Sequence, residues 1–254
     1  MSDPTSKDDE LAGSEQPFVQ HLMELRDRLV KAAIAVGIAA ALLFFFPGPG
    51  ALYDLLAAPL VAHLPKGATL IATSGLSPFM VPLKILLMAA FLLSLPHTLY
   101  QVWAFIAPAL YQNEKRLVLP LVLSSVLLFF AGMAFAYFLV FPLVFKFLAG
   151  VTPVGVNMAT DIDKYLSFIL GMFVAFGATF EVPVVVVLLN RMGVVSLAQL
   201  RQARPYVIVG AFVLAAVITP PDVISQVLLA VPLIVLYEAG LWFCRFIHPR
   251  VRDE

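Results

Sequence analysis

Long runs of apolar residues alternate with short charged segments along the chain. A helix needs about 20 apolar residues to cross the hydrocarbon core of a bilayer. Six runs reach or approach that length, at residues 29–46, 78–105, 117–145, 165–189, 206–218 and 223–244. The pattern therefore predicts an all-α membrane protein with six transmembrane helices.

The fifth and sixth runs predict short helices. Residues 206–218 would rise only about 20 Å at 1.5 Å per residue, less than the roughly 30 Å of the hydrocarbon core. Pro232 and Glu238 interrupt the sixth run, and Pro82 and Pro96 are expected to kink the second. Two short helices beside longer ones indicate a locally thin bilayer.

Basic residues are unequally divided between the two sides of these predicted spans, and an excess of Lys and Arg marks cytoplasmic loops. One side carries Lys7, Arg26, Arg28, Lys31, Lys115, Arg116, Arg191, Arg201, Arg204, Arg245, Arg250 and Arg252. The other side carries Lys66, Lys146 and Lys164, with Lys84 near the boundary. Both termini are therefore expected in the cytoplasm.

The composition excludes several classes of protein. Hydrophobic residues make up 61% of the 254 positions and charged residues 13%, whereas a soluble domain has about 45–50% and about 25%. The 16 basic residues are balanced by 16 acidic ones, so no net basic field is available for binding nucleic acid.

The polar and acidic residues 1–16 predict a disordered cytoplasmic tail and not a secretory signal. Residues 17–246 then form the transmembrane domain, and residues 247–254 a short cytoplasmic tail.

Signatures of enzymes and of metal or cofactor binding are missing from the sequence. Cys244 is the only cysteine, which excludes an internal disulfide. The four histidines are scattered over different regions, and no phosphate-binding loop or nucleophile motif occurs. We therefore expect a protein that is not an enzyme and that holds neither metal nor cofactor.

An amphipathic helix is predicted to lead into the first span, because apolar residues recur there at spacings of three and four. These residues are Phe18, Leu22, Leu25 and Leu29. His21, Glu24 and Arg28 share a neighbouring face, and Glu24 can pair with Arg28 one turn away. The charges either face water at the membrane surface or form a binding surface.

The second span ends in an aromatic segment followed by charged residues. Trp103 and Tyr111 are typical of the aromatic belt at a membrane interface. Glu114, beside Lys115 and Arg116, is either a solvated cap of the third helix or an acid that receives a cation.

Glu181 interrupts the fourth apolar run. A charged group at that depth costs at least about 2.5–3.5 kcal/mol on insertion scales, so an intramembrane acid suggests function. The alternative is a neutral acid that bonds Thr179 or nearby backbone, since Pro183 frees a carbonyl in the preceding turn. After the fifth run, Asp222 is expected to cap the last helix at a rigid outer turn.

Motifs in these segments, taken in order, resemble the TatC family, the multispanning component of the twin-arginine protein translocase. They are HLMELRDRL at 21–29, YQVWAFIAPALY at 100–111, GMAFAYF at 132–138, FEVP at 180–183, RPY at 204–206 and TPPD at 219–222. The resemblance extends from about residue 17 to residue 246.

The resemblance implies a cup-like receptor for folded proteins that carry twin-arginine signal peptides. By motif match, Glu24 and Glu114 form an acidic cytoplasmic patch that receives the two arginines. Arg26, Phe105 and Tyr111 belong to or support the same surface. Two planar guanidinium groups suit carboxylates, which accept them bidentately.

The resemblance also implies partners and further sites. Glu181 would be the polar group of the concave face, and Pro220, Pro221 and Asp222 an outer functional element. TatA-like and TatB-like single-span proteins would dock on the fifth and sixth helices, with self-association in a receptor complex. Transport would be driven by the proton-motive force across the bacterial cytoplasmic (inner) membrane.

Two other functions are compatible with the composition alone. A proton-coupled secondary transporter of a small solute could use Glu181 as its proton site, although the chain lacks the internal repeat of many such transporters. An intramembrane enzyme would need a nucleophile and a base at matching depth, and no such pair is evident.

Overall fold

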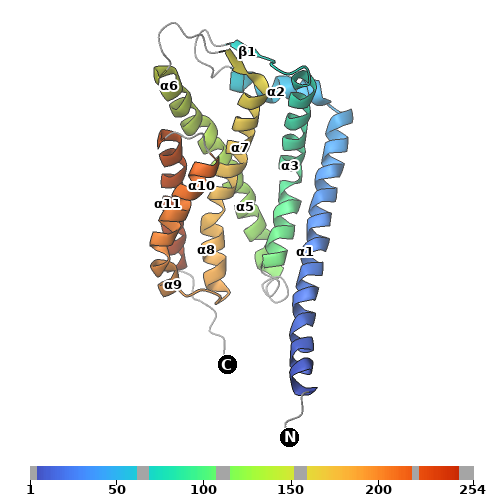
Figure 1. Ribbon diagram of the computed structural model, residues 1–254, viewed down its shortest axis with the longest axis vertical. Helices are drawn as coiled ribbons and strands as arrows, with labels where there is room; N and C mark the ends of the chain where they lie inside the picture. Colours follow the sequence, from blue (N-terminus) through green and yellow to red (C-terminus); the bar gives the residue numbers. More distant parts are fainter. Residues whose placement is uncertain (1–4, 62–68, 107–114, 152–158, 219–222, 246–254) are drawn as a thin grey trace.

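The computed structural model describes residues 5–61, 69–106, 115–151, 159–218 and 223–245. Within these residues, five helical stretches are long and apolar enough to cross a membrane. They are Val19–Phe45, Ser77–Ile106, Val118–Phe147, Ile162–Arg191 and Gln226–Cys244. They run side by side, and both chain ends lie at the same end of the bundle (Figure 1). The prediction of a helical, multi-pass membrane protein is confirmed.

The first helix, α1 (Thr5–Phe45), packs along α3 (Ser77–Ile106). It stops where the sequence predicts, because Gly48 adopts a φ of 93° that glycine tolerates best. The short helix α2 (Pro49–Val61) follows. At its other end α1 begins at Thr5, within the segment for which the composition predicts disorder. Extending an existing helix costs little, and acidic residues favour a helix start.

The third and fourth spans each contain an irregularity. The third consists of α5 (Lys115–Phe135), the π-helical turn η1 (Ala136–Val140) and α6 (Phe141–Val151). The fourth consists of α7 (Ile162–Phe180) and α8 (Val182–Arg191), which meet at Glu181. Pro183 lies in the first turn of α8, and its missing N–H ends the hydrogen-bond ladder of α7 there.

The last two helices of the bundle differ in length. After the short α9 (Leu197–Gln202), α10 (Arg204–Ile218) has 15 residues and rises about 22 Å, which confirms that the fifth predicted helix is short. The prediction of a short sixth helix is wrong: α11 (Val223–Cys244) has 22 residues and rises about 33 Å. Neither Pro232 nor Glu238 interrupts the helix. Glutamate is a good helix former, and the Glu238 carboxylate accepts a hydrogen bond of 2.7 Å from Arg204.

Two short strands lie at the end of the bundle opposite the termini (Figure 1). Strands β1 (Thr69–Ile71) and β2 (Ala159–Asp161) pair in parallel, with Thr69 opposite Ala159. Asp161 accepts hydrogen bonds from the Thr73 hydroxyl and from the Lys164 N–H. These bonds hold the pKa of Asp161 at about 2, below its ordinary value of 3.8.

A second polar contact fixes the same end of the bundle. The ammonium group of Lys84 on α3 lies 2.6 Å from a carboxylate oxygen of Asp163 and 2.9 Å from the hydroxyl of Ser167. Both partners lie on α7, so the second and fourth spans are joined near this end of the bundle.

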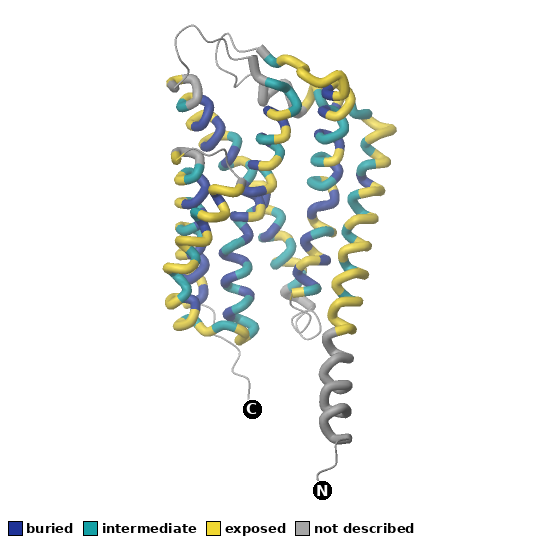
Figure 2. Tube along the Cα trace, in the orientation of Figure 1, coloured by how far each residue is buried: buried dark blue, intermediate teal, exposed yellow. Residues whose placement is uncertain are grey.

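The interior of the bundle is built around α7 (Figure 2). Phe176, Leu166 and Ile169 of this helix are fully buried. Gly132 of α5 allows close approach, because a Cβ atom there would come within 2.4 Å of the carbonyl oxygen of Phe176. The outer faces of the helices expose large apolar side chains such as Phe138 and Val217, as expected for surfaces that contact lipid.

Candidate functional site

The end of the bundle that carries both termini holds a charged pair on α1. The Nε and a terminal nitrogen of Arg28 lie 2.9 and 2.6 Å from the same carboxylate oxygen, Oε1, of Glu24. This confirms the pair predicted from the one-turn spacing. Oε2 of Glu24 makes no hydrogen bond with any described residue. The carboxylate is therefore oriented by Arg28 and keeps one oxygen for another donor.

An aromatic contact joins this part of α1 to the end of α3. The rings of His21 and Phe105 are stacked, with centroids 4.4 Å apart and planes 18° from parallel. Glu24 lies three residues after His21, on the same side of the helix. Phe105 and Glu24, which are far apart in the sequence, are thereby brought to one surface.

Arg26 has a different setting from Arg28. Its guanidinium pairs with the adjacent Asp27 at 2.8 Å, and its side chain is 71% exposed. The structure thus places Arg26 at the same end of the bundle but does not bring it into contact with Glu24 or Phe105. Its assignment to the binding surface stays a prediction.

Several predicted site residues lie outside the described part of the chain. Glu114 and Tyr111 belong to residues 107–114, which connect α3 to α5. Pro220, Pro221 and Asp222 belong to residues 219–222, which connect α10 to α11. Their roles stay predictions.

A second polar site lies in the middle of the bundle at the junction of α7 and α8. Glu181 is 8% exposed, and both of its carboxylate oxygens lack a hydrogen-bond partner among the described residues. The hydroxyl of Ser125 on α5 lies close enough to interact with this carboxylate, although it does not reach good hydrogen-bond geometry. The alternative in which Thr179 satisfies the acid is not supported by any hydrogen bond in the described residues.

Trp103 completes this buried polar cluster. Its indole N–H donates to the Ser125 hydroxyl at 2.8 Å, and its side chain is only 2% exposed. The prediction that Trp103 belongs to an exposed interface belt is therefore wrong. Sequence reasoning missed this contact because Trp103 and Ser125 are 22 residues apart on different helices, although a polar group inside an apolar span requires some partner.

The described residues hold no group of three or more His, Cys, Asp or Glu side chains that could bind a metal ion. The described residues offer a half-exposed carboxylate on α1, one turn from the His21–Phe105 stack. They also offer a buried acid beside the Ser125 hydroxyl in the centre of the bundle.

Known proteins of one family match this chain over most of its length. The model of the family described as "Sec-independent protein translocase protein (TatC)" matches residues 20–232. The chain is 55% identical over 239 residues to the Sec-independent protein translocase protein TatC of Escherichia coli (strain K12), covering 94% of this chain and 92% of that protein. It is 56% identical over 229 residues to TatC of Azotobacter chroococcum mcd 1, covering 90% and 89%.

The fold matches as well. A crystal structure of the twin-arginine translocase receptor TatC superposes with a TM-score of 0.77 at 43% identity, covering 89% of this chain and 99% of that one. The sequence comparison and the structure comparison both extend over nearly the whole chain. The chain belongs to the TatC family.

Proposed function

We propose that this protein is the receptor subunit of a twin-arginine translocase, which binds the signal peptides of folded precursors and mediates their export across the membrane. Its membership of the TatC family supports this proposal, as does the fold that it shares with a structure described as a translocase receptor. The family is one of transport proteins, which agrees with the absence of enzyme motifs in the sequence.

The proposed topology has six crossings with both termini in the cytoplasm of a bacterial cell, in its cytoplasmic (inner) membrane. The position of both chain ends at one end of the bundle supports an even number of crossings (Figure 1). The short α10 would then be the fifth crossing, in a locally thinned bilayer, and the bundle would present a cup-like concave face.

Two observations support the binding site: the His21–Phe105 stack, which joins α1 to α3, and the Glu24–Arg28 pair, which begins one turn further along α1. An arginine of the signal peptide would donate to Oε2 of Glu24 while Arg28 retains Oε1. The Phe105 ring offers a face on which a planar guanidinium can stack. A lysine has the charge but neither the fork nor the plane, which gives the site its preference for arginine.

The remaining assignments complete this proposal. Glu114 would receive the second arginine, and Arg26 and Tyr111 would belong to the rim of the same surface. Glu181 would face a polar element of the cargo or of a partner helix. TatA-like and TatB-like proteins would dock on α10 and α11, and the outer turn with Pro220, Pro221 and Asp222 would be a further functional element. Transport would draw on the proton-motive force.

The alternative of a proton-coupled transporter of a small solute rests on Glu181 alone. The buried carboxylate of Glu181 is compatible with it. The family, however, is that of protein translocases, and the same carboxylate is equally available to a polar group of a partner helix. We therefore favour the receptor function.

The proposal is tested with the purified protein in lipid nanodiscs and a synthetic signal peptide that carries either Arg-Arg or Lys-Lys. The guanidinium fork supplies an additional charge-assisted hydrogen bond that a lysine cannot make, worth about 1.5–3 kcal/mol. The Arg-Arg peptide should therefore bind roughly tenfold or more tightly than the Lys-Lys peptide. Glu24→Gln should remove most of that preference. Glu238→Gln, which neutralises an acid on α11, is the matched control and should keep it. Equal binding of both peptides to the wild-type protein would contradict the proposal.

A further inference from the structure

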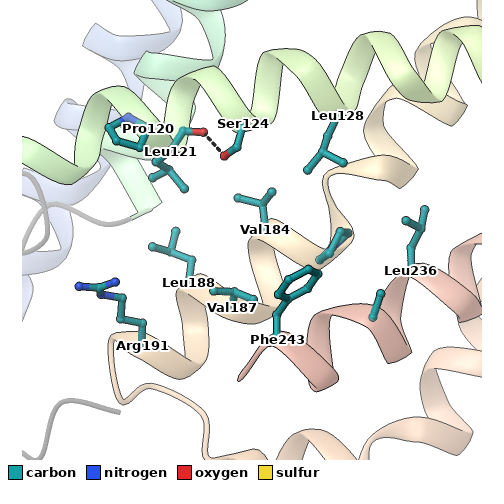
Figure 3. A pocket seen from close by; sticks show the side chains of 12 residues that line it. Pro120, Leu121, Ser124, Leu128, Val184, Val187, Leu188, Arg191, Leu236 and Phe243 are labelled. Atoms are coloured by element: carbon teal, nitrogen blue, oxygen red, sulfur yellow. Dashed lines mark hydrogen bonds between the residues drawn. The ribbon is translucent and has the colours of Figure 1, made fainter. Parts of the chain in front are cut away.

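An apolar groove separates α5 from α8 and α11 at the end of the bundle where the termini lie (Figure 3). Its volume is about 620 Å³. Leu121 and Leu128 line it from α5, Val187 from α8, and Leu236 and Phe243 from α11. None of these residues belongs to the proposed signal-peptide surface on α1 and α3.

The only charge that lines the described part of the groove lies at one end. Arg191, the last residue of α8, lies at that end (Figure 3) and is the only charged residue among the described residues that line the groove. Ser124 is the other polar side chain near its centre, and its hydroxyl already donates to the carbonyl of Leu121 at 2.9 Å. The groove therefore requires a ligand that is apolar along its length and anionic at one end.

The depth of the groove corresponds to one leaflet of a bilayer. Arg191 ends the fourth apolar span, and Phe243 lies one residue before the end of the last span. Leu128 lies ten residues beyond the start of the third span, Val118–Phe147, which is about 15 Å along a helix. The hydrocarbon core is about 30 Å thick, so the groove extends from the interface to about the middle of the membrane.

We propose that this groove binds an acyl chain of an anionic phospholipid whose phosphate contacts Arg191. Guanidinium groups bind phosphate oxygens bidentately. Because an arginine has five N–H donors, it can bind a phosphate while it keeps another hydrogen bond or ion pair. Anionic lipids are available in the cytoplasmic leaflet, which is the leaflet at this end in the proposed topology.

The size of the groove favours a lipid over a helix of a partner protein. A helix with its side chains is about 10 Å across, so 620 Å³ would hold only about five residues of it. A flexible acyl chain can instead fill the space between α5 on one side and α8 and α11 on the other. Bound there, it would support the inner half of α8, next to the break at Glu181.

Native mass spectrometry of the purified protein tests this proposal with the wild-type chain. The protein is titrated with phosphatidylglycerol or with phosphatidylcholine of identical acyl chains. One tightly retained lipid is expected, with phosphatidylglycerol bound about tenfold more tightly. Absence of a retained lipid, or equal retention of the two, would overturn the proposal.

Variants locate the site. Arg191→Gln should abolish the preference for phosphatidylglycerol, whereas Arg201→Gln, which removes an exposed arginine of α9, should preserve it. Val187→Trp should displace the lipid, and Ala239→Leu provides a second, milder filling of the same groove. Val174→Trp, at an exposed position of α7, is the matched control. Unchanged binding in both groove-filling variants that still fold would place the lipid elsewhere.

A photoreactive residue at position 187 distinguishes the lipid from a protein occupant in native membranes. Crosslinking to phospholipid supports the proposal. Crosslinking to another polypeptide in place of lipid would overturn it and identify the groove as a docking site for a helix.

Discussion

The contact between Gly132 and α7 gives the most direct prediction about packing in this fold. A Cβ atom at position 132 would lie 2.4 Å from the carbonyl oxygen of Phe176, 2.8 Å from its carbonyl carbon and 3.0 Å from Cα of Gly177. All three atoms belong to the backbone of a buried helix. Because no side-chain rotation can relieve the clash, Gly132→Ala must push α5 and α7 apart.

The size of the effect follows from two opposing terms. Overpacking a core lowers the free energy of unfolding by about 1–3 kcal/mol. Replacing glycine by alanine within a helix raises it by up to about 1 kcal/mol. We expect a net destabilisation of about 1–2 kcal/mol, or roughly 2–8 °C in melting temperature for a chain of this size. Gly171 on α7 is the matched control, since no atom lies within 4 Å of its Cβ position, and Gly171→Ala should raise stability.

Thermal unfolding of the wild type, Gly132→Ala and Gly171→Ala in the same detergent, followed by circular dichroism, measures both changes in stability. Melting temperatures that fall for Gly132→Ala and rise for Gly171→Ala would agree with the structure. If Gly132→Ala melted at or above the wild-type temperature, α5 and α7 could not be in the contact described.

Three further changes test other parts of the structure. Tyr237→Phe removes a buried hydroxyl that donates to a carbonyl of α9 at 2.7 Å; it should cost about 1 kcal/mol in denaturant unfolding, whereas Tyr206→Phe, at an 80% exposed residue, should cost nothing. Because the pKa of Asp161 is lowered in the folded protein, its contribution is present above about pH 4 and is lost as the pH falls toward 2. The Thr73 N–H donates to Asp161 at 3.2 Å, so its protection factor against amide exchange should fall in that range, and Asp161→Asn should abolish the change. Glu181→Gln should melt at or above the wild-type temperature, because a neutral amide is easier to bury than a carboxylate without partners; a clear loss of stability would show that the acid has a partner.

The long helices were predictable because their signal is local and strong. The apolar runs at 29–46, 78–105, 117–145 and 165–189 fall within or nearly within helical spans of the structure. The pair of Glu24 with Arg28 was predictable for the same reason, since a one-turn spacing fixes the geometry. The break at Glu181 agrees with the effect expected of Pro183.

Contacts between distant segments could not be predicted in this way. The parallel pairing of β1 with β2 joins residues about 90 positions apart, and strands of three residues leave no periodic signal. The His21–Phe105 stack and the Trp103–Ser125 hydrogen bond depend on how α1, α3 and α5 pack. The sixth apolar run, 223–244, coincides with α11. Only the shortening expected from Pro232 and Glu238 was wrong, and the partner of Glu238, Arg204, lies on another helix.

Site-specific photocrosslinking in native membranes tests the central claim most directly. Probes beside Glu24 and beside Glu114 would be exposed to a precursor that carries an Arg-Arg signal or its Lys-Lys counterpart. The account predicts crosslinks with the Arg-Arg precursor only, and their loss when Glu24→Ala and Glu114→Ala are combined. Equal crosslinking of both precursors, or crosslinks that survive the double change in a folded and inserted protein, would contradict it.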